Sequence, residues 1–151
     1  TYWAVVKGIP KPPQGRIDVP LLKAQGPDGD RVRAGDKNDE NAQHAITYFA
    51  VVDQAPPITA WVSLKPVTGR QHQLRAHMAY IGHPILGDEK YDGNADMPEG
   101  ISKKLHLHAR RIVFPHPREC VVDISAELPA HMRETWNAFG FDPDRYETDT
   151  E

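Results

Sequence analysis

The segment from Leu64 to Asp88 constrains the fold more than any other part of the chain, because its pattern specifies a strand, a helix and a structured loop in succession. Residues 61–65 alternate apolar with polar side chains, which predicts a strand with one buried face. Pro66 ends that strand because it lacks the amide hydrogen that a sheet ladder needs. The following helix is expected to have Thr68 as its N-cap, Gly82 as the left-handed residue after its end, and an apolar face of Leu74, Met78 and Ile81.

Short apolar runs bounded by turn residues predict the other strands, at residues 1–7, 17–22, 45–52, 105–114 and 120–124. Residues 25–41 are rich in Gly, Asp and Lys, which predicts a mobile, hydrated hairpin or loop outside the core. A closing helix is expected from Pro129, with Gly140 as its cap and Met132, Trp136 and Phe139 on its buried face. We therefore expect a single α+β domain over residues 1–151, with a mainly antiparallel sheet and its helices packed on one side.

Composition limits the possible functions without choosing one. The formal net charge is −3, which is not typical of a nucleic-acid-binding protein. Acidic residues are concentrated in a C-terminal tail over residues 142–151, whereas the stretch between Lys65 and Arg111 is basic, so a local basic face is expected. The single cysteine, Cys120, excludes an internal disulfide and suits a reducing, cytoplasmic location. No apolar run approaches the ~20 residues of a membrane span.

The segment from Leu64 to Asp88 resembles the third sequence motif of the RluA-type RNA pseudouridine synthases, Pro-x-Thr-Gly-Arg-x-His-Gln-Leu/Ile-Arg-x-His. Residues 66–77 fill every fixed position of this motif, and residues 82–91 fill its usual continuation, Gly-His-Pro-Ile-x-Gly-Asp followed by Lys-Tyr. Three more segments are similar to the family: residues 2–8 to its tyrosine motif, 15–21 to its Gly-x-Ile-x-x-Pro-Leu segment, and 107–117 to its late Leu-His-Ala motif. The resemblance covers most of residues 2–117.

This resemblance implies an isomerase that converts uridine in ribosomal or transfer RNA to pseudouridine without a cofactor. The reaction breaks the N–C glycosidic bond, rotates the uracil and rejoins it through carbon, so it needs a carboxylate, a base for a late proton and a dry pocket. By resemblance, Tyr2 packs on the base, Arg75 pairs with the catalytic carboxylate and keeps it ionised, and Leu107 lines the uracil pocket.

Three more polar side chains, Lys65, Arg70 and Gln73, are candidate contacts to phosphate or sugar, which fix the register of an RNA rather than read its sequence. For Arg70 there is also a physical argument from the helix itself. A cation in the first turn opposes the helix macrodipole at a cost of a few tenths of a kcal/mol. An anionic partner therefore explains Arg70 better than helix stability does.

Each assignment has a plainer alternative. By spacing alone, Arg75 could be a solvated helix residue, Tyr2 a core aromatic of its strand, and Leu107 ordinary core. The histidines also suggest a metal hydrolase, but His72 and His77 are five residues apart on the predicted helix and so lie well apart around its axis. Structural histidines bonded to backbone groups are favoured, and no metal is expected.

One motif of the family is absent from the sequence, namely the His-Arg-Leu-Asp segment that carries the catalytic aspartate and precedes the tyrosine motif. The chain also begins inside a predicted strand. We therefore expect the C-terminal part of a catalytic domain that is inactive alone and self-associates through the exposed edge of its first strand. The alternative function is a non-catalytic RNA-binding module derived from the same fold.

Overall fold

The computed structural model describes residues 1–26, 29–55, 58–92, 96–118 and 120–144. Within these ranges the elements follow one another in the order β1 (Tyr2–Lys7), β2 (Gln14–Asp18), β3 (Leu21–Gly26), β4 (Gly29–Ala34), β5 (Ile46–Ala55), β6 (Thr59–Pro66), α1 (Gln73–Tyr80), β7 (Leu107–Ala109), β8 (Arg111–Phe114), β9 (Val122–Ser125) and α2 (Ala130–Phe139). None of the helices in this part of the chain is long and apolar enough to cross a membrane.

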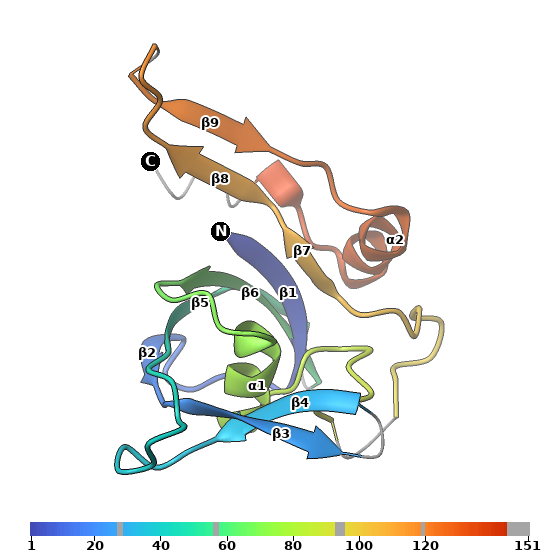
Figure 1. Cartoon of the computed structure of the whole chain (residues 1–151). Helices are drawn as coiled ribbons and strands as arrows, with labels where there is room; N and C mark the ends of the chain where they lie inside the picture. Colours follow the sequence, from blue (N-terminus) through green and yellow to red (C-terminus); the bar gives the residue numbers. More distant parts are fainter. Residues whose placement is uncertain (27–28, 56–57, 93–95, 119, 145–151) are drawn as a thin grey trace.

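Five strands form the central sheet in the order β2-β5-β6-β1-β7, and each neighbouring pair is antiparallel. The hairpin of β5 and β6 is its longest ladder, and a β-bulge between Val51 and Asp53 bends it. Figure 1 shows the sheet curving around α1. The prediction of an α+β fold with a mainly antiparallel sheet is confirmed.

The two helices cover opposite faces of this sheet. On β1, Trp3 and Val5 pack in a cluster with α2, whereas Ala4 and Val6 pack in a second cluster with α1. The prediction that both helices pack on one side is therefore wrong. Consecutive apolar residues in a short strand are typical of burial on both faces, and this pattern outweighs the alternation that we inferred for the strands.

The strands at the centre of the sheet are enclosed by their neighbours. Thr59 to Leu64 are all buried, so β6 is not the half-buried strand that its sequence predicts. β1 pairs with β6 over its whole length and with β7 at Tyr2 to Ala4, and farther along the Val5 amide donates to the His106 carbonyl at 3.2 Å. The expected exposed edge at the first strand is thus also wrong, and self-association stays a prediction without that support.

The polar segment at residues 25–41 is partly a hairpin, as predicted, but one of its residues belongs to the core. β3 and β4 pair in a separate two-stranded sheet, whose tip at residues 27–28 lies outside the described residues. Val32 and Leu21 are buried against Ala45 and Ala76. The hairpin therefore packs against α1 rather than standing free in solvent.

The predicted strand at residues 105–114 is broken in two by a β-bulge. The amides of both Arg110 and Arg111 donate to the carbonyl of Thr1, at 2.9 and 3.1 Å, so two residues oppose one. A bulge bends its strand and increases the local twist, which explains why β8 leaves the main sheet that β7 belongs to.

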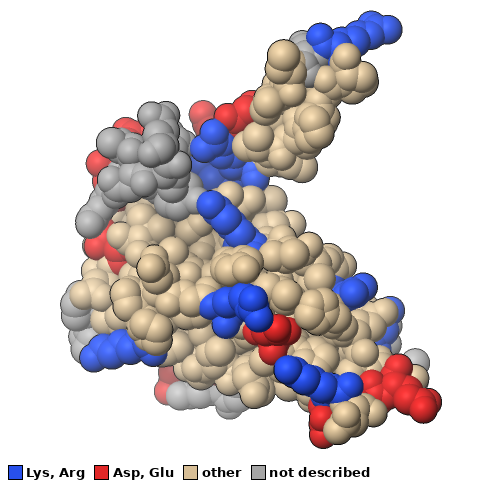
Figure 2. Space-filling model, turned by 90° about the vertical axis from the view of Figure 1, so that its left-hand side faces the viewer, with Lys and Arg blue, Asp and Glu red and all other residues tan. Residues whose placement is uncertain are grey.

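Beyond the bulge, β8 and β9 form a two-stranded arm that projects from the body (Figure 1). One face of the arm is a ladder of apolar pairs, Ile112 with Ile124 and Phe114 with Val122. Ile112 and Ile124 are 57% and 55% exposed, so this face is open to solvent. Figure 2 shows the arm standing off the body with a notch beneath it.

The closing helix forms as predicted. α2 follows Pro129, ends at Gly140 in the left-handed conformation with φ 74°, and buries Met132 and Trp136. The ring of Trp136 lies 5.3 Å from that of Trp61, which anchors the helix on the sheet. Of the predicted acidic tail, residues 145–151 lie outside the described residues.

Candidate active site

A bidentate ion pair joins α1 to the loop that follows it. The Arg75 guanidinium donates from Nε to Asp88 Oδ2 at 3.1 Å and from Nη2 to Asp88 Oδ1 at 2.8 Å. The Asp88 side chain is fully buried, and that of Arg75 is 20% exposed. The hydrogen bond with Asp88 raises the pKa of Arg75, so the guanidinium stays charged and fixed in one orientation.

Tyr91 supports the same guanidinium from another side. Its ring centroid is 5.1 Å from the Arg75 Cζ, within the range of a cation–π contact. Its hydroxyl accepts from the Val32 amide at 3.1 Å and lies 2.7 Å from His72 Nδ1. Burial, and after it the charge of Arg75, lowers the pKa of His72, so a neutral ring accepts the tyrosine hydrogen. The Tyr91 ring that contacts the Arg75 guanidinium is therefore fixed in position by its own hydrogen bonds.

The exposed side of Arg75 faces a hollow of about 410 Å³. Three distant segments supply its walls: Tyr2 from β1, the residues around Arg75, and Leu107 from β7. Leu105 adds a second apolar side chain that sequence reasoning missed. The structure thus brings together Tyr2, Arg75 and Leu107, to which the family resemblance assigns contacts with the base, with the catalytic carboxylate and with the uracil pocket.

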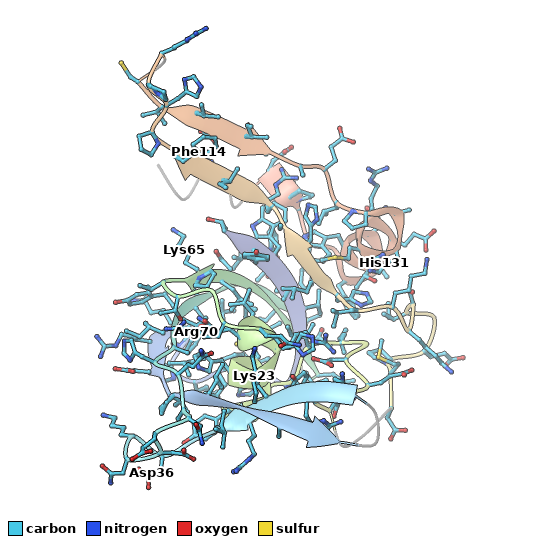
Figure 3. All side chains as sticks on the ribbon, in the orientation of Figure 1. Lys23, Asp36, Lys65, Arg70, Phe114 and His131 are labelled. Atoms are coloured by element: carbon cyan, nitrogen blue, oxygen red, sulfur yellow. The ribbon has the colours of Figure 1, made fainter. Side chains whose placement is uncertain are left out.

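Arg70 lines this hollow, but Lys65 does not. The Arg70 Nε donates to the carbonyl of His44 at 2.8 Å, which anchors the base of the side chain. Lys65 lies on the face of β6 opposite Leu64 and borders two other hollows. Figure 3 shows Lys65 and Arg70 on the same side of the molecule, away from His131 on α2.

Gln73 has a structural position rather than the exposed one expected of an RNA contact. It is 4% exposed, and its amide nitrogen donates to the Ile46 carbonyl at 2.9 Å and to Thr47 Oγ1 at 3.0 Å. Its Oε1 accepts from the Thr68 hydroxyl at 2.6 Å and from the Arg70 amide at 3.1 Å. Every polar atom of the side chain is therefore engaged in joining β5 to the turn before α1.

This network also explains why Thr68 does not cap the helix. Its hydroxyl is committed to Gln73 and to the Ile46 amide, and α1 begins only at Gln73. The N-cap is His72, which has the left-handed φ of 53° and makes no side-chain cap hydrogen bond. The prediction of Thr68 as N-cap is therefore wrong, and the segment before α1 is a turn held by side chains.

His77 extends this network into the core as a structural histidine. Its Nε2 lies 2.9 Å from the Val19 carbonyl and therefore carries the hydrogen, while Nδ1 lies 2.8 Å from the Thr47 hydroxyl. Burial lowers the pKa of His77, and burial also lowers the pKa of His106. Among the described residues no three His, Cys, Asp or Glu side chains converge as a metal site would require.

These buried histidines predict a dependence of stability on pH. Because their folded-state pKa values lie below the ordinary 6.5, the unfolded chain binds protons first as the pH falls. The free energy of unfolding should therefore decrease below pH 6.5. Each of the two histidines can contribute at most about 1.4 kcal/mol for every pH unit. Urea unfolding at pH 7.5, 6.5 and 5.5 would measure this, with a shallower slope for His77→Gln and an unchanged one for the exposed His116→Gln. A flat profile would contradict it.

Comparison with known proteins identifies the family to which this chain belongs. A family model described as RNA pseudouridylate synthase matches residues 1–80. The dual-specificity RNA pseudouridine synthase RluA of Salmonella typhi is 42% identical over 118 residues, which are 77% of this chain and 50% of that protein. The mitochondrial RNA pseudouridine synthase 4 of Arabidopsis thaliana is 33% identical and aligns with 90% of this chain and 39% of its own length. The chain belongs to the RNA pseudouridylate synthase family.

Solved structures agree with this assignment. Human RNA pseudouridylate synthase domain containing 4 superposes with a TM-score of 0.72 at 28% identity, over 92% of this chain and 61% of that one. Human RNA pseudouridylate synthase domain containing 1 gives a TM-score of 0.66 at 25% identity, over 94% of this chain and 65% of that one. The chain spans about half the length of the curated relatives that it matches.

The site residues that sequence reasoning missed are Asp88, Tyr91, His72 and Leu105. Asp88 and Tyr91 lie in the motif continuation that we used only to identify the family. The usable signal was chemical, because a buried aspartate needs a cationic or hydrogen-bonding partner and Arg75 lies on the adjacent helix. For Leu105 the signal was the alternation of the predicted strand, which places Leu105 and Leu107 on the same face, but we assigned the pocket only to Leu107.

Proposed function

We propose that this chain supplies the uracil-binding part of an RNA pseudouridine synthase centre, which isomerises specific uridines of ribosomal or transfer RNA. The observation that carries this proposal is the meeting of Tyr2, Arg75 and Leu107 around one hollow of about 410 Å³. Apolar walls can exclude water from a detached uracil, and the ring of Tyr2 can pack on it. The names of the relatives support RNA as the substrate.

In this proposal Arg75 holds two carboxylates at once. The contacts with Asp88 use Nε and Nη2, and among the described residues no hydrogen bond engages Nη1. A guanidinium has five donor hydrogens, so it can bind a second carboxylate without releasing the first. The sequence-based expectation that Arg75 pairs with the catalytic aspartate is compatible with the Asp88 pair. That aspartate would come from a His-Arg-Leu-Asp segment, which this sequence does not contain.

The test is release of tritium from RNA labelled at uracil C5, because carbon replaces that hydrogen in pseudouridine formation. We expect no turnover by the 151-residue chain alone, and turnover when an upstream segment with the His-Arg-Leu-Asp motif is joined to it. Turnover by the chain alone would show that another carboxylate attacks. An inactive extended protein that still binds RNA would favour the non-catalytic RNA-binding module.

RNA binding should be electrostatic despite the net charge of −3. We expect that Arg70→Ala weakens binding and makes the slope of log affinity against log salt shallower by about 0.7 to 0.9. Titration of labelled RNA at several salt concentrations would measure both quantities. The matched control is Arg133→Ala on α2, beyond the opposite face of the sheet. Equal effects of the two substitutions would argue that binding is not localised at the site.

A further inference from the structure

A row of three side chains crosses the central sheet on the face opposite α1. The register pairs Arg16 on β2 with Tyr48 on β5, and Tyr48 with Lys65 on β6. Residues directly opposite each other in a ladder point to the same face, with Cβ atoms about 5 Å apart. An aromatic ring therefore lies between two cationic side chains on adjacent strands.

This part of the sheet face is not covered by the packing that buries the rest. Farther along the same face, Trp3, Val5 and Trp61 are enclosed by α2. Tyr48 lies on an interior strand of the sheet and is nevertheless 45% exposed. A ring that the fold leaves open at an interior position is available to a ligand.

The row lines a hollow of about 610 Å³, with Gln14, Ala50 and Ser63 as further walls. None of the described residues that line it is acidic. Arg16 does make an ion pair with Asp18 at 3.0 Å, which offsets part of its charge. No carboxylate is paired with Lys65 among the described salt bridges, so the hollow remains cationic at its Lys65 end.

Shared lining residues relate this hollow to the candidate active site. Lys65 also borders a hollow of about 650 Å³ beneath the arm. Tyr2 and Pro66 line both this second hollow and the active-site hollow. Pro66 and Lys65 therefore lie between the active-site hollow and Tyr48, where a polynucleotide that leaves the active site would pass.

We propose that Arg16, Tyr48 and Lys65 form a stacking site for one unpaired base of the RNA strand that flanks the target uridine. This inference rests on the proposed function. The face of an aromatic ring accepts any base, and flanking cations contact the phosphates on either side of it. The row would hold the strand in place without reading its sequence.

The test uses the 151-residue chain and a fluorescently labelled oligouridylate of about 12 nucleotides, within the range that single-strand sites cover. Tyr48→Ser should weaken binding by about 5- to 150-fold, the effect of removing one base–aromatic stack. Tyr48→Phe keeps the ring and should stay within about 2-fold of the wild type. The matched control is Tyr80→Ser, which removes another exposed tyrosine outside the row.

The salt dependence of binding distinguishes the phosphate contact of Lys65 from the stacking contact of Tyr48. Lys65→Ala should make the salt slope shallower by about 0.7, the value for one contact to a single strand, whereas Tyr48→Ser should leave it unchanged. If Tyr48→Ser binds like the wild type while Arg70→Ala binds more weakly, the stacking site is wrong and the proposed RNA function stands. If the wild-type chain does not bind the RNA, the inference falls together with RNA binding by this chain. If instead a protein segment binds over Tyr48, the row is a protein contact and the inference is overturned.

Discussion

Replacing Arg75 by lysine should lower pseudouridine formation by about 100-fold or more in a protein that joins this chain to an upstream His-Arg-Leu-Asp segment. Lysine keeps the positive charge but loses the planar guanidinium that binds Asp88 through two donors. A single ammonium group cannot hold Asp88 bidentately and orient a second carboxylate from the same plane. The measurement is the initial rate of tritium release, together with an unfolding curve for each variant.

The matched control is Arg133→Lys, an arginine on α2 with a longer ion pair of 3.6 Å to Glu127. This control should change neither the rate nor the stability by a measurable amount. If Arg75→Lys kept a rate near that of the wild type, a charge at this position would suffice. The two-carboxylate arrangement would then be wrong.

Replacing Gly87 by alanine should destabilise the fold by about 3 kcal/mol or more. Gly87 has φ of +81°, and an added Cβ would lie 2.1 Å from the carbonyl oxygen of Lys104 and 2.9 Å from the amide nitrogen of Leu105. These neighbours are backbone atoms, so one of the two chain segments must move. Urea unfolding followed by circular dichroism would measure the loss.

Gly82 provides the control for backbone conformation alone. Its φ is +90°, and an added Cβ would have nothing within 4 Å. Gly82→Ala should therefore cost only about 1 to 2 kcal/mol, the strain of a left-handed alanine. Because Gly87 precedes Asp88, we also expect its variant to disturb the Arg75 pair. Equal costs for the two variants would mean that the loop at Gly87 yields without strain.

Local patterns in the sequence predicted the elements whose causes are local. α2 begins after Pro129 and ends at Gly140 because a fixed proline φ and a left-handed glycine act within a few residues. β5 and β6 follow from β-branched and aromatic runs separated by a turn. The meeting of Tyr2, Arg75 and Leu107 was predicted through the family resemblance, since they are far apart in sequence.

The features that we predicted wrongly depend on contacts between distant segments. Tertiary packing decides which face of the sheet a helix covers. The neighbouring residues Trp3 and Ala4 are both apolar, so the sequence does not show which of them contacts a given helix. The break between β7 and β8 depends on the Thr1 carbonyl accepting from both Arg110 and Arg111. Thr68 has the residue type of an N-cap, but Gln73 offers its hydroxyl a buried partner instead. No local pattern could have ranked these competing hydrogen bonds.

The bulge at Arg110 is the hinge about which the β8–β9 arm can change its angle to the main sheet. β8 spans four residues, so the arm extends about 13 Å from its fixed end. A change of about 20° in the bend at this point would move its tip by about 4 to 5 Å, a displacement comparable to the spacing between strands. The width of the hollow beneath the arm is therefore determined where Arg110 and Arg111 meet Thr1. A substitution at this joint would change how thick a strand the hollow admits without altering any side chain at its centre.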